Sequence, residues 1–248
     1  MNLLVKRGMR QLTPGRFGGR GVGFIAALGL AAFALAGQAY AKPGGTVTVA
    51  PTIVAEAVGA RVAVYSSPKA RKPFLVLSNP TADGGRLVFL VKNRAPGWEQ
   101  VLLAKRPNGS TGWVRDSAVM LGLDPYSVAV SLHQHRIVVR NGSRVILSAR
   151  AGVGRSVLPT PTGRYYIIEL LRQADPAGPY GPFAFGLSAF SNVLYSFGGG
   201  PGEIGLHGTD EPALLGGDVS HGCIRVSNAV ITRLASILPL GTPVTIVR

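Results

Sequence analysis

The residues of this sequence best suited to covalent chemistry are Cys223 and the histidines that precede it. Cys223 is the only cysteine among 248 residues, so it has no disulfide partner within the chain. His221 lies two positions before Cys223, and His207 lies sixteen positions before it. A cysteine attacks as its thiolate and needs a neighbouring base to become one. The pattern therefore predicts an activated cysteine nucleophile.

The residues around Cys223 and His207 suggest a division of roles. His207 is the candidate base, which takes the thiol proton and later returns it to a leaving amine. We expect the carbonyl of the adjacent Gly208 to orient the imidazole. Gly222 leaves space for a substrate carbonyl. The amides of Gly222 and Cys223 are the candidate donors to the oxyanion of a tetrahedral intermediate.

Other polar side chains near the cysteine have further candidate roles. His221 is expected to assist the oxyanion or the thiolate, or else to fix the loop. Ser220 is a candidate for substrate binding or for a hydrogen bond within the loop, and Thr209 is a further candidate for substrate binding. Arg225 is expected to hold a substrate carboxylate as a fork or to form a structural ion pair. Asn228 is expected to cap a helix.

Zinc binding is the alternative with different chemistry. His133 and His135, together with His207, His221 and Cys223, offer imidazole and thiolate ligands. However, His133 and His135 fall in a predicted turn, and no carboxylate companion is evident. Zinc binding is therefore the weaker interpretation.

The first 41 residues have the three parts of a secretory signal peptide. A basic region without acidic residues precedes an apolar run over 22–36, and Ala39-Tyr40-Ala41 forms a small-x-small cleavage site. The apolar run is shorter than the roughly 20 residues that span a membrane. Retention as an anchor is thus the weaker interpretation. We expect export to the periplasm or cell wall, with membrane contact only through a transient leader.

The chain is strongly basic, with a formal net charge of +15. The predicted leader carries five of the basic residues, namely Lys6, Arg7, Arg10, Arg16 and Arg20. The others are scattered along the chain, and no nucleic-acid-binding motif accompanies them. This distribution predicts a solvated basic surface and no nucleic-acid partner. Attraction to an acidic envelope polymer is a further possibility.

Two domains are predicted after a linker at 42–51. Within 52–121, five short apolar runs separated by Gly, Pro and Asn turns predict a small all-β barrel (61–65, 74–77, 86–91, 98–103 and 113–114). Residues 98–101 and 107–114 resemble the closing strands of bacterial SH3-like domains. This resemblance implies a module that binds the cell wall. A spacer packed on its neighbour is the alternative.

The second predicted domain, 126–248, is mainly β with little helix. Alternating or apolar runs predict strands (127–132, 136–140, 144–149, 164–170 and 244–247). Asn141-Gly142 is typical of a tight hairpin turn. Residues 228–238 have an apolar face at helical spacing and end before Pro239 and Gly241. The boundary between the domains is expected at 121–125.

Several segments of the second domain resemble one known family. His207–Thr209 followed by Ser220–Asn228 resembles the signature of the L,D-transpeptidases, the YkuD-type catalytic domain. Residues 160–163, 180–187 and 241–244 are similar to other segments of that family, so the resemblance spans about 126–248. It implies a β-sandwich-like catalytic fold with few helices. The position of a helper tyrosine found in some members is left open between Tyr180 and Tyr195.

The resemblance implies a cysteine acyltransferase that acts on peptidoglycan stem peptides without a cofactor. Cys223 would attack the bond between the L-centre of a diamino acid at position three and the terminal D-alanine. A side-chain amine of a second stem would resolve the thioester and give a 3→3 cross-link. Carbapenems would acylate the same cysteine. The alternatives are an L,D-carboxypeptidase or endopeptidase that hydrolyses stem peptides, and a non-catalytic wall-binding protein.

Overall fold

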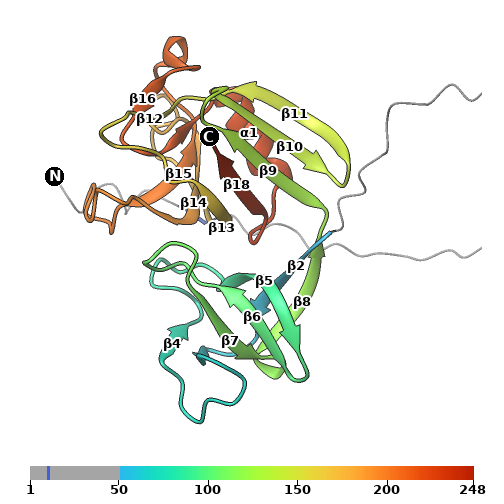
Figure 1. Cartoon of the computed structure of the whole chain (residues 1–248). Helices are drawn as coiled ribbons and strands as arrows, with labels where there is room; N and C mark the ends of the chain where they lie inside the picture. Colours follow the sequence, from blue (N-terminus) through green and yellow to red (C-terminus); the bar gives the residue numbers. More distant parts are fainter. Residues whose placement is uncertain (1–9, 12–50) are drawn as a thin grey trace, which may run out of the picture.

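The computed structural model describes residues 10, 11 and 51–248. Figure 1 shows two β-rich lobes, which meet where β8 (Val119–Asp124) leads into β9 (Tyr126–Ser131). We call residues 52–124 the N-terminal module and residues 126–248 the C-terminal module. Apart from Arg10, Gln11 and Pro51, the predicted signal peptide (1–41) and linker (42–51) lie outside the described residues. The helices among the described residues are all too short or too polar to span a membrane.

The N-terminal module is a five-stranded sheet with a separate hairpin. The sheet has the order β7-β6-β5-β2-β8, and β3 pairs with β4. The bounds are β2 (Thr52–Ala57), β3 (Arg61–Val64), β4 (Leu75–Ser78), β5 (Val88–Ala95), β6 (Trp98–Leu102), β7 (Thr111–Arg115) and the 3₁₀ helix η1 (Asp116–Ala118). Val62, Phe89, Val101 and Val114 belong to its own buried core. Strands occur in all five predicted regions. The SH3-like resemblance stays a prediction.

The boundary between the modules is shorter than predicted. Strand β8 continues through the predicted boundary at 121–125 as far as Asp124, which pairs with Thr52 of β2. Only Pro125 separates β8 from β9. The strand is interrupted there because a proline ring fixes φ and removes the backbone hydrogen-bond donor. Asp124 accepts hydrogen bonds from the Tyr126 amide at 2.8 Å and from Thr242 Oγ1 at 2.6 Å. These contacts fix the junction on both sides, and burial raises the pKa of the Asp124 carboxyl.

The C-terminal module is one curled sheet, so the predicted mainly β class with little helix is confirmed (Figure 1). The strand order is β11-β10-β9-β18-β13-β14-β15-β17, with β1 added against β13. These strands are β1 (Arg10–Gln11), β10 (Arg136–Asn141), β11 (Arg144–Arg150), β13 (Gly163–Arg172), β14 (Phe183–Phe190), β15 (Glu203–His207), β17 (Ile224–Arg225) and β18 (Pro243–Val247). A separate parallel pair joins β12 (Val153–Gly154) to β16 (Asp218–Ser220), and the 3₁₀ helix η2 spans Pro212–Leu214.

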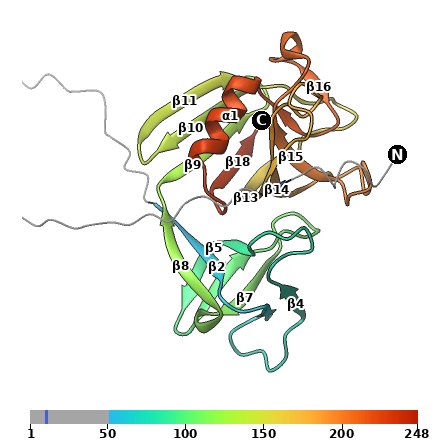
Figure 2. The same ribbon diagram turned by 180° about the vertical axis from the view of Figure 1, so that it is seen from behind.

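Helix α1 (Asn228–Ile237) packs on the curled sheet, as Figure 2 shows. It buries Ile231 and Leu234 in the same core as the sheet strands. Asn228 was expected to cap this helix, but the cap is Ser227, whose side chain accepts from the Val230 amide. Asn228 is the first helical residue instead. Its side chain is therefore available to the functional site.

The two modules are packed against each other. Tyr166 of β13 is 1% exposed, and its hydroxyl donates to the Leu102 carbonyl of β6 at 3.2 Å. Val88 and Leu90 of β5 complete this small buried cluster. Such packing is what the spacer interpretation requires of the N-terminal module. Binding to the cell wall stays a prediction.

Candidate active site

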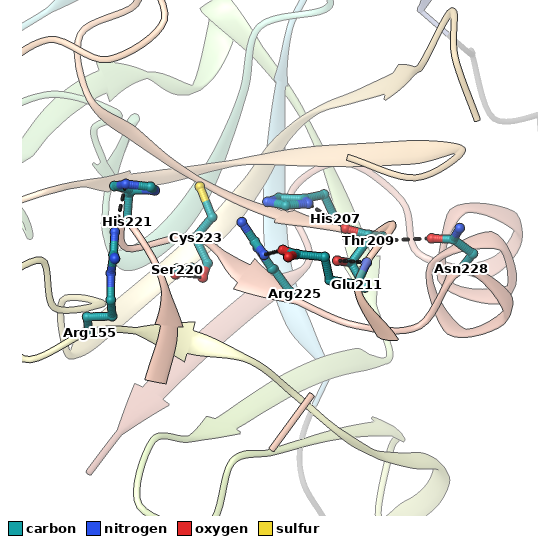
Figure 3. Close-up of polar contacts among 10 residues, drawn as sticks. Arg155, His207, Thr209, Glu211, Ser220, His221, Cys223, Arg225 and Asn228 are labelled. Carbon is teal, nitrogen blue, oxygen red and sulfur yellow. Dashed lines mark hydrogen bonds and ion pairs between the residues drawn. The ribbon is translucent and has the colours of Figure 1, made fainter. Parts of the chain in front are cut away.

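Strands β15 and β17 bring Cys223 and His207 to one place, although they lie sixteen residues apart. The two strands are parallel, with His207 opposite Arg225, and Cys223 immediately precedes β17. The Gly205 amide donates to Cys223 Sγ at 3.3 Å. A Cβ on Gly205 would lie 3.6 Å from His207 Cδ2 and 3.7 Å from Cys223 Sγ. The imidazole and the thiol therefore border the same point above β15 (Figure 3).

His207 is held as a neutral base. Its ring is buried, and Nδ1 lies 2.6 Å from the Gly208 carbonyl. A carbonyl oxygen only accepts, so Nδ1 carries the proton and Nε2 keeps its lone pair. Burial lowers the pKa of His207 to about 4. The imidazole is consequently uncharged at neutral pH and able to take a proton. The Gly208 amide donates to the Phe183 carbonyl at 3.3 Å.

Cys223 rests as a thiol rather than as a standing thiolate. It is partly buried, and the loss of solvent raises the pKa of its sulfur. The Gly205 amide and the positive charge of Arg225 act in the opposite direction, but with smaller effect. Neither group of the pair is therefore charged at neutral pH.

The loop before Cys223 is braced by buried hydroxyls. Ser220 Oγ donates to the Cys223 carbonyl at 2.6 Å and accepts from the Gly222 amide at 3.0 Å. Gly222 has φ +121°, which favours glycine. Thr160 Oγ1 donates to the Gly222 carbonyl and accepts from the Gly154 amide, both at 2.8 Å. Ser220 thus serves the loop rather than the predicted substrate contact, and the Gly222 amide is engaged within the loop.

Replacing Thr160 with valine should destabilise the protein by about 1–3 kcal/mol, because two buried backbone groups lose their partner. Urea unfolding of the full chain measures this. The matched variant Thr160→Ser keeps the hydroxyl and should stay much closer to the wild type. Equal stability of Thr160→Val and Thr160→Ser would contradict the bracing role.

His221 is exposed and is paired with a residue that the sequence analysis did not identify. Arg155 Nη2 lies 2.7 Å from His221 Nε2, and the Phe197 ring stacks on the imidazole at 5.4 Å. A guanidinium only donates, so Nε2 accepts and the proton of neutral His221 sits on Nδ1. The Arg155 amide donates to the Ser220 carbonyl at 3.1 Å, which places Arg155 beside the cysteine loop. In Figure 3, Cys223 lies between the two histidines.

Arg225 forms one of its two predicted contacts. Its Nη1 donates to Glu211 Oε2 at 3.0 Å, which is the expected ion pair. Its Nε is buried and has no hydrogen-bond partner among the residues described. The same guanidinium lowers the pKa of both His207 and Cys223, so its charge acts directly on the pair. Arg225 therefore forms the predicted ion pair, and its contact with a substrate stays a prediction.

Of the two candidate tyrosines, Tyr180 is the one beside the pair. Its ring lies 4.8 Å from that of His207, and burial raises the pKa of its hydroxyl. Tyr195 is 72% exposed and lies in the connection between β14 and β15. The sequence offered no signal that separates these two tyrosines, because both lie in segments without a clear pattern.

Thr209 is buried and braces the turn after His207. Its amide donates to Asn228 Oδ1 at 2.9 Å, and its Oγ1 accepts from the Glu211 amide at 3.0 Å. Both polar groups are used within the protein, in contrast to the predicted substrate contact. Asn228, expected as a cap, instead ties α1 to this turn.

The histidines of the zinc alternative are separated by their partners. His135 Nε2 lies 2.8 Å from Asp218 Oδ1, while His221 faces Arg155 and His207 faces Gly208. Across residues 51–248, no group of three or more His, Cys, Asp or Glu side chains is arranged to hold a metal ion.

The fold and this site define a mainly β protein with a cysteine and a neutral histidine at adjoining strand ends. Residues 125–246 match the L,D-transpeptidase catalytic domain, YkuD. YkuD of Bacillus subtilis is 40% identical over 124 residues, which cover 50% of this chain and 67% of that protein. YkuD of Bacillus licheniformis is 33% identical over 154 residues, which cover 59% and 85%. The chain therefore belongs to the YkuD family of L,D-transpeptidases.

A solved structure is also similar over part of the chain. Bd1075 of Bdellovibrio bacteriovorus shares 31% sequence identity with a TM-score of 0.37. The match covers 49% of this chain, and the chain spans 47% of the length of that protein.

Proposed function

We propose that this protein is an exported peptidoglycan L,D-transpeptidase, which forms 3→3 cross-links through a thioester on Cys223. The observation that carries the proposal is the juxtaposition at Gly205 of the Cys223 thiol with an imidazole whose Nε2 is unprotonated. That pairing supplies a nucleophile and a base without any cofactor. Membership of the L,D-transpeptidase family supplies the substrate class.

The acylation step uses His207 twice. Its Nε2 takes the Sγ proton as sulfur bonds to the carbonyl carbon of the diamino acid at position three. The carbon–nitrogen bond to D-alanine then breaks, and His207 returns the proton to the leaving amine. A side-chain amine of a second stem next attacks the thioester. It loses a proton to His207, which passes the proton to the departing Cys223 sulfur.

The oxyanion and the substrate carboxylate require separate donors. We assign the oxyanion to the Cys223 amide, since Ser220 Oγ already engages the amide of Gly222. The second donor comes from Tyr180 or His221, the two side chains that flank the cysteine loop. The Arg225 guanidinium, whose positive charge acts on His207 and Cys223, is the candidate partner of a substrate carboxylate. Carbapenems would enter the same site and acylate Cys223.

The products formed from purified disaccharide-tetrapeptide test this proposal. Mass spectrometry should detect a cross-linked dimer that has lost one D-alanine. Tripeptide without any dimer would replace transfer with hydrolysis, because water would then be resolving the thioester. An unchanged substrate that still binds the protein would leave only wall binding. Either of these two results would overturn the transpeptidase assignment.

A further inference from the structure

We propose that the N-terminal module holds one wall of the active site in place. The wall is the connection 191–202 between β14 and β15, which we call the β14–β15 loop. Arg106 and Asn108, in the connection between β6 and β7, are the positioning residues. In Figures 1 and 2, the β6–β7 connection extends from the N-terminal module toward this loop. The activity part of the inference rests on the proposed function, whereas the structural part does not.

Arg106 donates hydrogen bonds to three backbone carbonyls of the loop. Its Nη1 donates to the Pro201 carbonyl at 2.6 Å, and its Nη2 donates to the carbonyls of Ser191 at 2.9 Å and Leu194 at 2.8 Å. The guanidinium also lies over the rings of Phe190 and Tyr195, at 5.0 and 4.9 Å from their centroids. Only a planar, multiply donating group satisfies all of these contacts at once. Arg106 thereby joins both ends of the loop.

Asn108 continues the edge of β14 as a strand partner would. Its Nδ2 donates to the Phe190 carbonyl at 2.7 Å, and its Oδ1 accepts from the Phe190 amide at 2.9 Å. This paired arrangement imitates the two hydrogen bonds of an antiparallel strand. The last residue of β14 is consequently anchored to the N-terminal module, immediately before the loop begins.

The loop is shaped to receive Arg106. The Ser191 amide donates to the Gly202 carbonyl at 2.8 Å, which closes the base of the loop. Gly202 has φ +72°, and a Cβ there would collide with the Leu194 carbonyl and lie 3.2 Å from Arg106 Nη2. A glycine is therefore needed for the close approach of this carbonyl and the guanidinium.

The loop reaches the catalytic pair in two ways. Phe197 stacks on His221, which is two residues from Cys223. Gly202 leads directly into β15, which carries Gly205 and His207. Phe197 is 44% exposed, so the loop presents an aromatic ring beside His221. Arg106 therefore fixes a segment that borders the cysteine on the His221 side and leads into the His207 strand.

The decisive experiment compares Arg106→Ala in the full chain with Arg115→Ala. Arg115 is a matched control, because it too is an arginine that lies over an aromatic ring. That ring, Trp98 at 4.4 Å, belongs to the N-terminal module itself. Hydrogen exchange read by mass spectrometry should become about tenfold faster in peptides covering 191–202 of Arg106→Ala. Arg115→Ala should leave exchange there unchanged. Arg106→Lys should protect the loop only in part, because an ammonium lacks the planar fork.

A second readout connects the loop to chemistry. Acylation of Cys223 by a carbapenem should slow about tenfold in Arg106→Ala, since a displaced wall misplaces the reacting atoms. Alkylation by iodoacetamide, which needs no wall, should keep its wild-type rate. Asn108→Ala should shift both carbapenem acylation and loop exchange in the same direction and remains informative if Arg106→Ala misfolds.

Two results would overturn the inference: unchanged loop exchange in both Arg106→Ala and Asn108→Ala, or faster exchange with wild-type acylation. A wild-type protein that resists carbapenem altogether would count against the proposed function. The exchange experiment would still decide whether the N-terminal module holds the loop.

Discussion

Replacing Cys223 with alanine will abolish cross-linking of disaccharide-tetrapeptide, with a fall in turnover on the order of 10⁴-fold or more. The expectation follows from composition and geometry together. The chain has no second cysteine, and the only thiol is the one that borders His207. Without Sγ there is no atom to carry the acyl group. Intact-mass measurement should show an acyl adduct on the wild type and none on the variant.

The fold should survive this replacement. Sγ accepts a single hydrogen bond, from the Gly205 amide, while the Cys223 carbonyl keeps its bond from Ser220. The melting temperature of Cys223→Ala should thus remain near that of the wild type. Cys223→Ser, which is nearly isosteric, controls for packing and should be almost as inactive. Dimer formation by a folded Cys223→Ala protein would refute the thioester mechanism.

Replacing His207 with asparagine should lower turnover about 10²- to 10⁴-fold. An asparagine amide can still donate to the Gly208 carbonyl as Nδ1 does, but it offers no base in place of Nε2. The pKa of Cys223 is raised, so the variant thiol must wait for solvent to deprotonate it. Rates of iodoacetamide alkylation across pH measure this directly. The variant should react more slowly at pH 7 and should approach the wild-type rate only at high pH.

The same variant tests the buried state of His207 through stability. Its pKa is lowered from 6.5 to about 4 in the folded protein, so the unfolded chain binds the proton more tightly. The contribution of neutral His207 to the free energy of unfolding is therefore complete above pH 6.5 and is lost as pH falls through about 4. This contribution is about 3 kcal/mol at most. Urea unfolding should show this extra acid sensitivity in the wild type but not in His207→Asn. Identical pH dependence in the two proteins would contradict a buried neutral imidazole.

The elements that follow simple periodicity were predictable from the sequence. The alternation around His133–His135 gave the hairpin of β9 and β10, and the apolar spacing of 228–238 gave α1. Strand β14 was not predicted, because it is buried on both faces and so lacks alternation. Strands β16 and β17 are too short to leave a pattern of their own.

The pairing of Cys223 with His207 was inferred from residue types, since a thiol and an imidazole have recognisable chemistry. The groups that position them could not be found in this way. Gly205 acts through its backbone amide, which has no side-chain signal in the sequence. The partners of Arg155 and Arg106 lie 66 and 95 residues away along the chain. Asn228 illustrates the same limit. Its position indicated a cap, while its partner Thr209 depends on how α1 meets the turn.

Strand β18 has a consequence for the order in which the protein can be assembled. It lies between β9 and β13, parallel to the former and antiparallel to the latter. The first half of the sheet cannot join the second until residues 243–247 have been synthesised and inserted. Contacts that bridge more than a hundred residues also make folding slow. A newly made chain therefore carries its cysteine in an unfinished sheet until β18 is inserted between β9 and β13.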